Sequence, residues 1–120
     1  MQNYKDLKVW EKAHQLTLLV YRATNTFPRD ELYSLTNQLR RAVSSVPANI
    51  AEGCGKKSQN DLANFLNIAL GSANEAENFL LFARDLEYLP LSGYENLYEK
   101  VNEVKAMLIS LINKVRTANI

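Results

Sequence analysis

Apolar residues recur at steps of three and four positions along almost the whole chain, in four separate segments. Residues at this spacing fall on one face of an α-helix and form a seam that packs against other helices. Four such seams predict an all-α protein, an antiparallel up-down-up-down four-helix bundle. The seams are Trp10, Ala13, Thr17, Val20, Thr24 and Phe27; Leu32, Leu35, Leu39, Ala42, Val46 and Ile50; Leu62, Phe65, Leu66, Ala69, Ala73, Ala76, Leu80 and Ala83; and Leu97, Val101, Val104, Leu108, Leu111 and Val115.

Helix start and stop signals lie between the seams. Pro28 precedes the polar first turn of the second helix, and Gly53-Cys54-Gly55 follows its last turn, where glycine would relieve left-handed backbone strain. Capping boxes are expected to open the third and fourth helices, at Ser58 with Asp61 and at Ser92 with Glu95. Short connections between these signals make neighbouring helices antiparallel. The predicted helices lie near residues 6–26, 29–53, 58–88 and 92–117.

The composition fits one soluble domain. The 120 residues, taken as a single domain over 1–120, are enough to bury one core, and four glycines and three prolines are too few for a many-turned β-fold. No apolar run resembles a signal peptide or approaches the roughly 18 residues that span a bilayer. Cys54 is the single cysteine, so no disulfide forms within the chain. These observations predict a cytoplasmic, reducing setting and no membrane partner.

Two helices carry more apolar residues than one seam requires. The first adds Leu16, Leu18, Leu19 and Tyr21, and the third adds Phe79, Leu81, Phe82, Leu86 and Leu89. A helix in a lone bundle buries one stripe and leaves its other face in water. The surplus therefore predicts a second contact surface and self-association, although scattered exposed apolar side chains are also common.

Charge is unevenly distributed along the sequence. Residues 1–57 hold nine Lys and Arg against five acids, whereas residues 58–120 hold five against eight. This layout suits an anionic partner or attraction between subunits, and it also suits ordinary solvated helix faces. The candidate phosphate contacts are Lys5, Lys8, Lys12, Arg40, Arg41, Lys56 and Lys57. No helix-turn-helix, zinc finger or aromatic RNA-binding pattern accompanies them.

Polar residues interrupt the second helix. Pro47 removes one backbone hydrogen bond and leaves the carbonyl of Val43 in need of another partner. Asn49 and Glu52 lie one turn apart near the seam, so we expect both to be hydrogen-bonded. These bonds would fix the helix register or satisfy polar groups of the third helix. A ligand site, or a buried pair of Glu52 with Arg41, are the alternatives. The structural polar set is Asn49, Glu52, Ser72 and Glu75.

Gly71 precedes Ser72 in the third helix. Glycine costs a helix roughly 1 kcal/mol relative to alanine. We therefore expect Gly71 to permit close approach of another helix of the bundle, with a ligand close to the backbone as the weaker option.

Catalytic and metal-binding patterns are incomplete. Glu11 and His14 have the spacing of a di-iron ligand pair, but His14 is the single histidine and such a site needs a second pair. Cys54 has no histidine to activate it. The GCGKKS segment lacks the strand and the first glycine of a phosphate loop. We therefore expect no enzyme activity, no cofactor and no metal.

Four motifs resemble those of the four-helix bundle proteins encoded in bacterial 23S ribosomal RNA intervening sequences. They are YKDLKVWEKA at 4–13, FPRDELYSLTNQLRRAVSSVPANIAEG at 27–53 with its PANIAEG helix end, and IALGSANEAE at 68–77. The resemblance covers essentially the whole chain. It implies a closed bundle that assembles as a ring-shaped homopentamer. Related accessory proteins of diversity-generating retroelements are thought to bind nucleic acid and a reverse transcriptase, which implies RNA or DNA binding here.

The leading hypothesis from the sequence is a non-catalytic, oligomeric module that binds RNA or DNA through basic residues. A protein–protein adaptor or scaffold is the alternative, in which the charges and the apolar surplus organise a ring and a protein partner. A bundle enzyme or metal protein is the third possibility.

Overall fold

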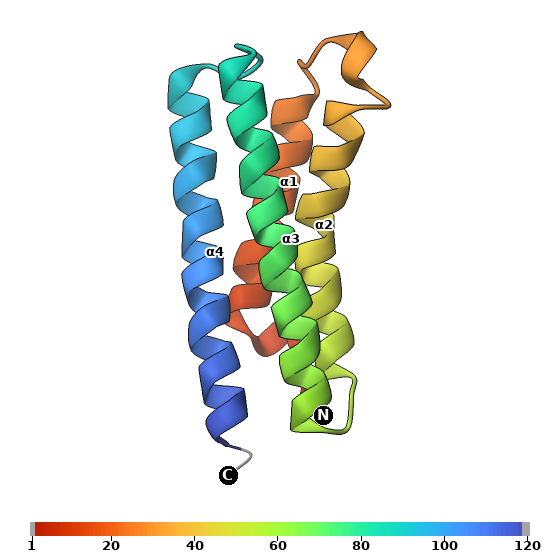
Figure 1. The fold of residues 1–120 in the computed structure, drawn as a ribbon, viewed down its shortest axis with the longest axis vertical. Helices are drawn as coiled ribbons and strands as arrows, with labels where there is room; N and C mark the ends of the chain where they lie inside the picture. The colour runs from red at the N-terminus through yellow and green to blue at the C-terminus, as the bar shows by residue number, and fades with distance from the viewer. Residues whose placement is uncertain (1, 119–120) are drawn as a thin grey trace.

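The protein is a bundle of four α-helices, seen in a computed structural model that describes residues 2–118 (Figure 1). Two short 3-10 helices, η1 and η2, precede the first and second long helices, and no strand occurs in this range. The prediction of an all-α bundle is therefore confirmed. The elements are η1 (Tyr4–Asp6), α1 (Lys8–Thr24), η2 (Arg29–Glu31), α2 (Leu35–Cys54), α3 (Gln59–Asp85) and α4 (Leu91–Thr117).

Each helix packs on its sequence neighbours, and α1 also packs on α4, which closes the bundle. The late part of each helix lies beside the early part of the next: Thr24 is hydrogen-bonded to Arg40, Gly53 adjoins Phe65, and the Arg84 guanidinium lies 5.1 Å from the Tyr94 ring centre. Neighbours therefore run in opposite directions, as Figure 1 shows. The bundle is 48 Å long and about half as wide. The 27-residue helices α3 and α4 span most of this length, at about 40 Å each, whereas α1 and α2 are shorter.

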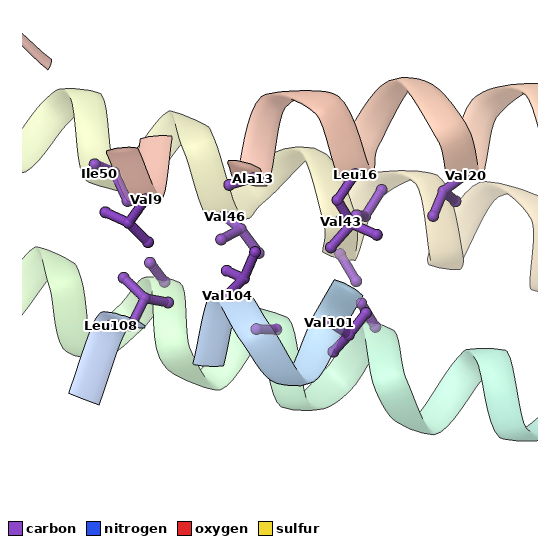
Figure 2. Close-up of a cluster of buried hydrophobic side chains, with 14 of the residues drawn as sticks. Val9, Ala13, Leu16, Val20, Val43, Val46, Ile50, Val101, Val104 and Leu108 are labelled. Atoms are coloured by element: carbon purple, nitrogen blue, oxygen red, sulfur yellow. The ribbon is translucent and has the colours of Figure 1, made fainter. Parts of the chain in front are cut away.

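The seams meet along the axis of the bundle. Figure 2 shows Val9, Ala13, Leu16 and Val20 of α1 pointing toward side chains of α2 and α4. Each fully buried aliphatic side chain contributes about 1.5–3 kcal/mol relative to an exposed one. The largest buried side chains are Leu16, Leu39, Ile50, Leu66, Leu80 and Leu108, so all four helices share one core.

The second helix begins six residues later than predicted. Residues 29–31 form η2, and the backbone of Ser34 leaves helical geometry before α2 starts at Leu35. Leu32, placed in the seam by its spacing, is 45% exposed. The segment is held from outside the helix, because Tyr88 Oη donates a 2.8 Å hydrogen bond to Glu31 Oε2. Tertiary contacts override the periodicity here.

The helix-end predictions have mixed outcomes. Ser58 Oγ accepts from the Asp61 N–H at 3.0 Å, which confirms the cap of α3. The prediction of a cap at Ser92 is wrong, because Ser92 lies inside α4, which starts at Leu91. Pro90 occupies the N-cap position and makes no side-chain cap bond. The prediction of a glycine in the left-handed conformation after α2 is also wrong, because Gly55 has φ −83°. Over residues 2–118 the residue with a positive φ is Glu87, whose φ is 62°, just beyond the end of α3.

Gly53 has a packing role instead of a conformational one. It is buried within α2, and a Cβ atom there would lie 2.9 Å from Phe65 Cβ of α3. That distance is too short for two carbon atoms, so glycine lets these two helices approach closely.

Candidate functional surfaces

Six exposed cations gather at one end of the bundle. They come from three segments: the start of the chain, the α2–α3 turn and the end of α4, which Figure 1 places at the same end. The Gln2 N–H donates to the Cys54 carbonyl at 3.2 Å, and Lys8 and Lys114 line one hollow of about 410 Å³, so the segments adjoin. We call this surface the basic end. It consists of Lys5, Lys8, Lys56, Lys57, Lys114 and Arg116, with Asp6, Glu52 and Asp61 as nearby acids.

The opposite end has the reverse charge. Residues 21–35 and 81–97 hold Arg22, Arg29 and Arg84 against Asp30, Glu31, Asp85, Glu87 and Glu95. The charge difference therefore lies along the long axis of the bundle. It does not follow the two halves of the sequence, because antiparallel helices from both halves contribute to both ends.

The cations of the basic end keep their charged groups in solvent. Lys5 Nζ lies 5.8 Å from the Tyr4 ring centre and Lys56 Nζ lies 5.2 Å from that of Phe65. These contacts orient the side chains without neutralising them. None of the six forms an ion pair with another residue in the range 2–118. They are therefore available to an anionic ligand.

Arg40 is committed to the fold. Its Nε donates to Thr24 Oγ1 at 2.8 Å, and its Nη2 donates to the Tyr21 carbonyl at 3.3 Å and to Asn25 Oδ1 at 3.2 Å. Its guanidinium also lies 4.9 Å from the Tyr21 ring centre. These contacts tie the last turn of α1 to α2, so they compete with the phosphate role predicted for Arg40.

The remaining predicted cations lie apart from the basic end. Lys12 pairs with Glu103 of α4 at 3.4 Å, on the side of the bundle, and Arg41 lies on the outer face of α2. The structure therefore brings together Lys5, Lys8, Lys56 and Lys57. Sequence reasoning missed Lys114 and Arg116 because they belong to the acidic half of the sequence. The predicted length and antiparallel direction of the last helix could have located them, because a helix of 27 residues carries its end back to the α2–α3 turn.

A second surface lies between α2 and α3. Arg41 and Glu75 line a hollow of about 390 Å³ together with Tyr33, Asn37, Gln38 and Phe79. Along the outside of α3, the exposed residues Ile68, Gly71, Phe82 and Leu86 continue the same surface at helical spacing. We call this surface the α2/α3 face. It is lined by Tyr33, Asn37, Gln38, Arg41, Ile68, Gly71, Glu75, Phe79, Phe82 and Leu86.

A hydrogen bond between two serines joins α2 to α3 beneath this face. Ser45 Oγ and Ser72 Oγ are 2.9 Å apart, and Asn49 Nδ2 donates to both Ser45 Oγ and the Ser45 carbonyl at 2.8 Å. Asn49 therefore reaches Ser72 through Ser45. The alternative of a buried ion pair between Arg41 and Glu52 is wrong, because both residues are exposed. Glu75, predicted as a structural polar residue, is exposed as well.

The expected role of Gly71 within the bundle is also wrong. A Cβ atom at this position would have no neighbour within 4 Å in the part of the chain that the structure describes. Gly71 lies on the outward side of α3, so it permits no close approach of α1, α2 or α4. Spacing identified a helical glycine but did not tell which side of the helix faces the core.

The residues considered for catalysis are engaged elsewhere. Glu11 accepts from Gln15 Nε2 at 3.4 Å, and the His14 ring stacks on Trp10 with centres 4.9 Å apart. Cys54 is 2% exposed, and this burial raises the pKa of its thiol, which keeps the group protonated. Over residues 2–118 no group of three or more His, Cys, Asp or Glu side chains is placed to hold a metal ion. No helix in this range is both long and apolar enough to cross a membrane.

The fold and these surfaces define a small all-helical bundle protein. The sequence matches the family described as 23S rRNA-intervening sequence protein over residues 5–110, and the chain belongs to this family. It is also similar to a crystal structure of a protein of unknown function from the S23 ribosomal protein family of Bacteroides thetaiotaomicron. That similarity has 30% sequence identity and a TM-score of 0.80, and it covers 88% of this chain and 95% of the other. No curated protein matches the sequence.

Proposed function

We propose that this protein is a non-catalytic, self-associating module of the cytoplasm that binds RNA or DNA, and that the basic end contacts the phosphates. The observation that carries the proposal is the gathering of six exposed cations from three segments at one end of the bundle. Phosphate contacts supply most of the sequence-independent affinity of nucleic-acid-binding proteins. The family resemblance supports the same ligand class.

Salt dependence tests the role of the basic end. If all six cations contact phosphates of a duplex, the logarithm of the binding constant falls with the logarithm of the salt concentration with a slope of about −5. Affinity should then drop about 10³-fold between 50 and 200 mM KCl. Fluorescence anisotropy with a labelled RNA hairpin, and with DNA of the same sequence, measures this and compares the two ligands. Absence of binding to micromolar hairpin at low salt would contradict the proposal.

A charge-reversal pair assigns the surface. Lys56→Glu with Lys57→Glu should weaken binding at least tenfold, since two attractive contacts become repulsive. The matched control is Arg22→Glu with Arg29→Glu, which makes the same charge change on exposed residues at the opposite end. Equal losses in the two double variants would mean that net charge governs binding and that the basic end has no special part in it.

Self-association is the second part of the proposal, and the resemblance implies five subunits. It is supported by large exposed side chains, among them Tyr33 at 90% exposed and Phe82 at 53%. The solution mass, measured by light scattering after size exclusion, gives the number of 13.6 kDa subunits directly. A mass of one subunit at all concentrations would contradict this part and leave the nucleic-acid part standing.

A protein–protein adaptor is the second candidate function. The α2/α3 face favours it, because that face mixes aromatic side chains with charges of both signs, as protein interfaces do. Recovery of one defined protein partner after nuclease treatment, with the basic-end variants binding it normally, would favour the adaptor over the nucleic-acid module.

A further inference from the structure

The α2/α3 face has an apolar surface that no residue of the range 2–118 covers. Ile68 and Phe82 of α3 are 51% and 53% exposed, and Leu86 is 49% exposed. They share the outward side of α3 with Gly71 and Glu75 because they follow one another at helical spacing. A helix buried on one side needs no such stripe on the other. The stripe therefore fits a second packing contact.

Gly71 lies in the middle of this stripe with open space above it. Its glycine costs helix stability, about 1 kcal/mol relative to alanine, and no contact with another residue of the described part of the chain offsets the cost. A helix from outside the chain can approach the α3 backbone most closely at such a position. The shape of the face thus favours a helical occupant.

The charges of the face favour an occupant with charges of both signs over a polyanion. Arg41 and Glu75 line the same hollow with opposite charges, and neither side chain forms an ion pair or hydrogen bond with another residue of the range 2–118. The cations suited to nucleic acid lie at the basic end instead. An occupant of the α2/α3 face that presents both a base and an acid can pair with both residues.

A second copy of this chain has the required chemistry. The chain is nearly neutral, with fourteen bases, thirteen acids and a net charge of +1, so two copies do not repel one another. Its own helices carry exposed apolar residues between charges of both signs: on α1, Leu18 lies between Glu11 and Arg22. In a second copy, Glu11 can pair with Arg41, and Arg22 can pair with Glu75.

We propose that the α2/α3 face is where a helix of a second copy of this chain docks, with its closest approach at Gly71. This inference rests on the self-association included in the proposed function and adds the surface, the point of closest approach and the two charged residues that orient the neighbour. It makes no use of the basic end, so the two surfaces can fail independently.

A size series at Gly71 tests the docking. Gly71→Ala and Gly71→Leu have room within the subunit and improve helix propensity, so both should leave the urea midpoint unchanged or raise it. Each larger side chain should nevertheless weaken assembly, and Gly71→Leu should raise the dissociation constant at least tenfold or leave a 13.6 kDa species. Asn96→Leu, at an exposed position on α4, is the control and should keep the wild-type mass. Wild-type mass for Gly71→Leu would overturn the proposal.

Charge reversal gives an independent readout. Arg41→Glu and Glu75→Arg should each weaken assembly, and both should keep their helical circular dichroism because the residues are exposed. A subunit mass of 13.6 kDa for wild-type protein at every concentration would overturn the docking proposal.

RNA hairpin binding by a dissociated Gly71→Leu subunit, with its dependence on Lys56 and Lys57 retained, would show that the docking and nucleic-acid surfaces are separate. Assembly that survives both reversals would overturn the roles of these charges.

Discussion

The hydroxyl of Thr17 lies 3.2 Å from the carbonyl oxygen of Val43, the oxygen that Pro47 leaves without its usual partner inside α2. The helix runs unbroken from Leu35 to Cys54 across the proline. The same hydroxyl lies 2.8 Å from the Ala13 carbonyl of its own helix, so one proton serves two acceptors. The expectation that Val43 needs a partner is confirmed, and the partner is supplied by α1.

Thr17→Val should lower the free energy of unfolding by about 1 kcal/mol, because it removes this donor and keeps the side-chain shape. The cost should shrink when Pro47→Ala restores a backbone N–H that can bond the Val43 carbonyl. Urea unfolding of the wild type, both single variants and the double variant measures the coupling. Equal costs of Thr17→Val in the two backgrounds would show that the Val43 contact contributes nothing.

Two buried threonines should respond in opposite ways to valine. Thr36 is 2% exposed and its Oγ1 has no hydrogen-bond partner among residues 2–118, so Thr36→Val should be neutral or stabilise by about 1 kcal/mol. Thr24 Oγ1 accepts from Arg40 and donates to the Val20 carbonyl, so Thr24→Val should destabilise by at least about 1 kcal/mol. Thermal unfolding ranks the two variants. The reverse order would contradict the assignment of partners.

Glu87→Gly should stabilise the protein by about 1 kcal/mol, less the entropy that glycine adds to the unfolded chain. Glu87 has φ 62° at the end of α3, where the Tyr88 N–H donates to the Ala83 carbonyl at 2.8 Å and the Glu87 N–H donates to the Arg84 carbonyl at 3.0 Å. Glycine ordinarily occupies this position of a helix end. Glu87→Ala separates backbone strain from loss of charge. A gain in urea midpoint as large for alanine as for glycine would exclude strain as the cause.

Arg40→Ala should lower stability without lowering RNA affinity. It removes three hydrogen bonds between α2 and the end of α1, at a cost of about 1–3 kcal/mol. Arg40→Lys keeps the charge but loses the fork of donors, so it should also destabilise. Urea unfolding and anisotropy on the same samples give both readouts. A loss of RNA affinity in folded Arg40→Ala, matching that of the Lys56 and Lys57 variants, would restore Arg40 to the phosphate surface.

The four helices and the core could be predicted because apolar spacing records which side of each helix is buried. Leu16, Leu39 and Leu108 follow that rule. Spacing does not record which helices are neighbours or how closely they approach. Gly53 and Gly71 illustrate this limit, since the one assigned to a helix end lies in a tight interhelical contact and the one assigned to such a contact faces solvent.

The candidate surfaces were only partly predictable for the same reason. Lys56 and Lys57 were identified as a local pair, but Lys114 joins them only through the return of α4 to the same end. Arg40 and Arg41 are adjacent in sequence, yet the first bonds to α1 while the second lines the α2/α3 face. Their difference depends on contacts with Thr24 and Asn25, which no local pattern encodes.

The separation of charge along the 48 Å axis gives the subunit an electric dipole moment along that axis. In the field of a polyanion such a molecule experiences a torque before it makes any contact. It rotates until Lys56 and its neighbours lead, and the acidic turns near Asp30 and Glu95 trail. If the basic end binds nucleic acid as proposed, collisions would be biased toward one orientation, and the flanks of the bundle would stay open while that end is engaged.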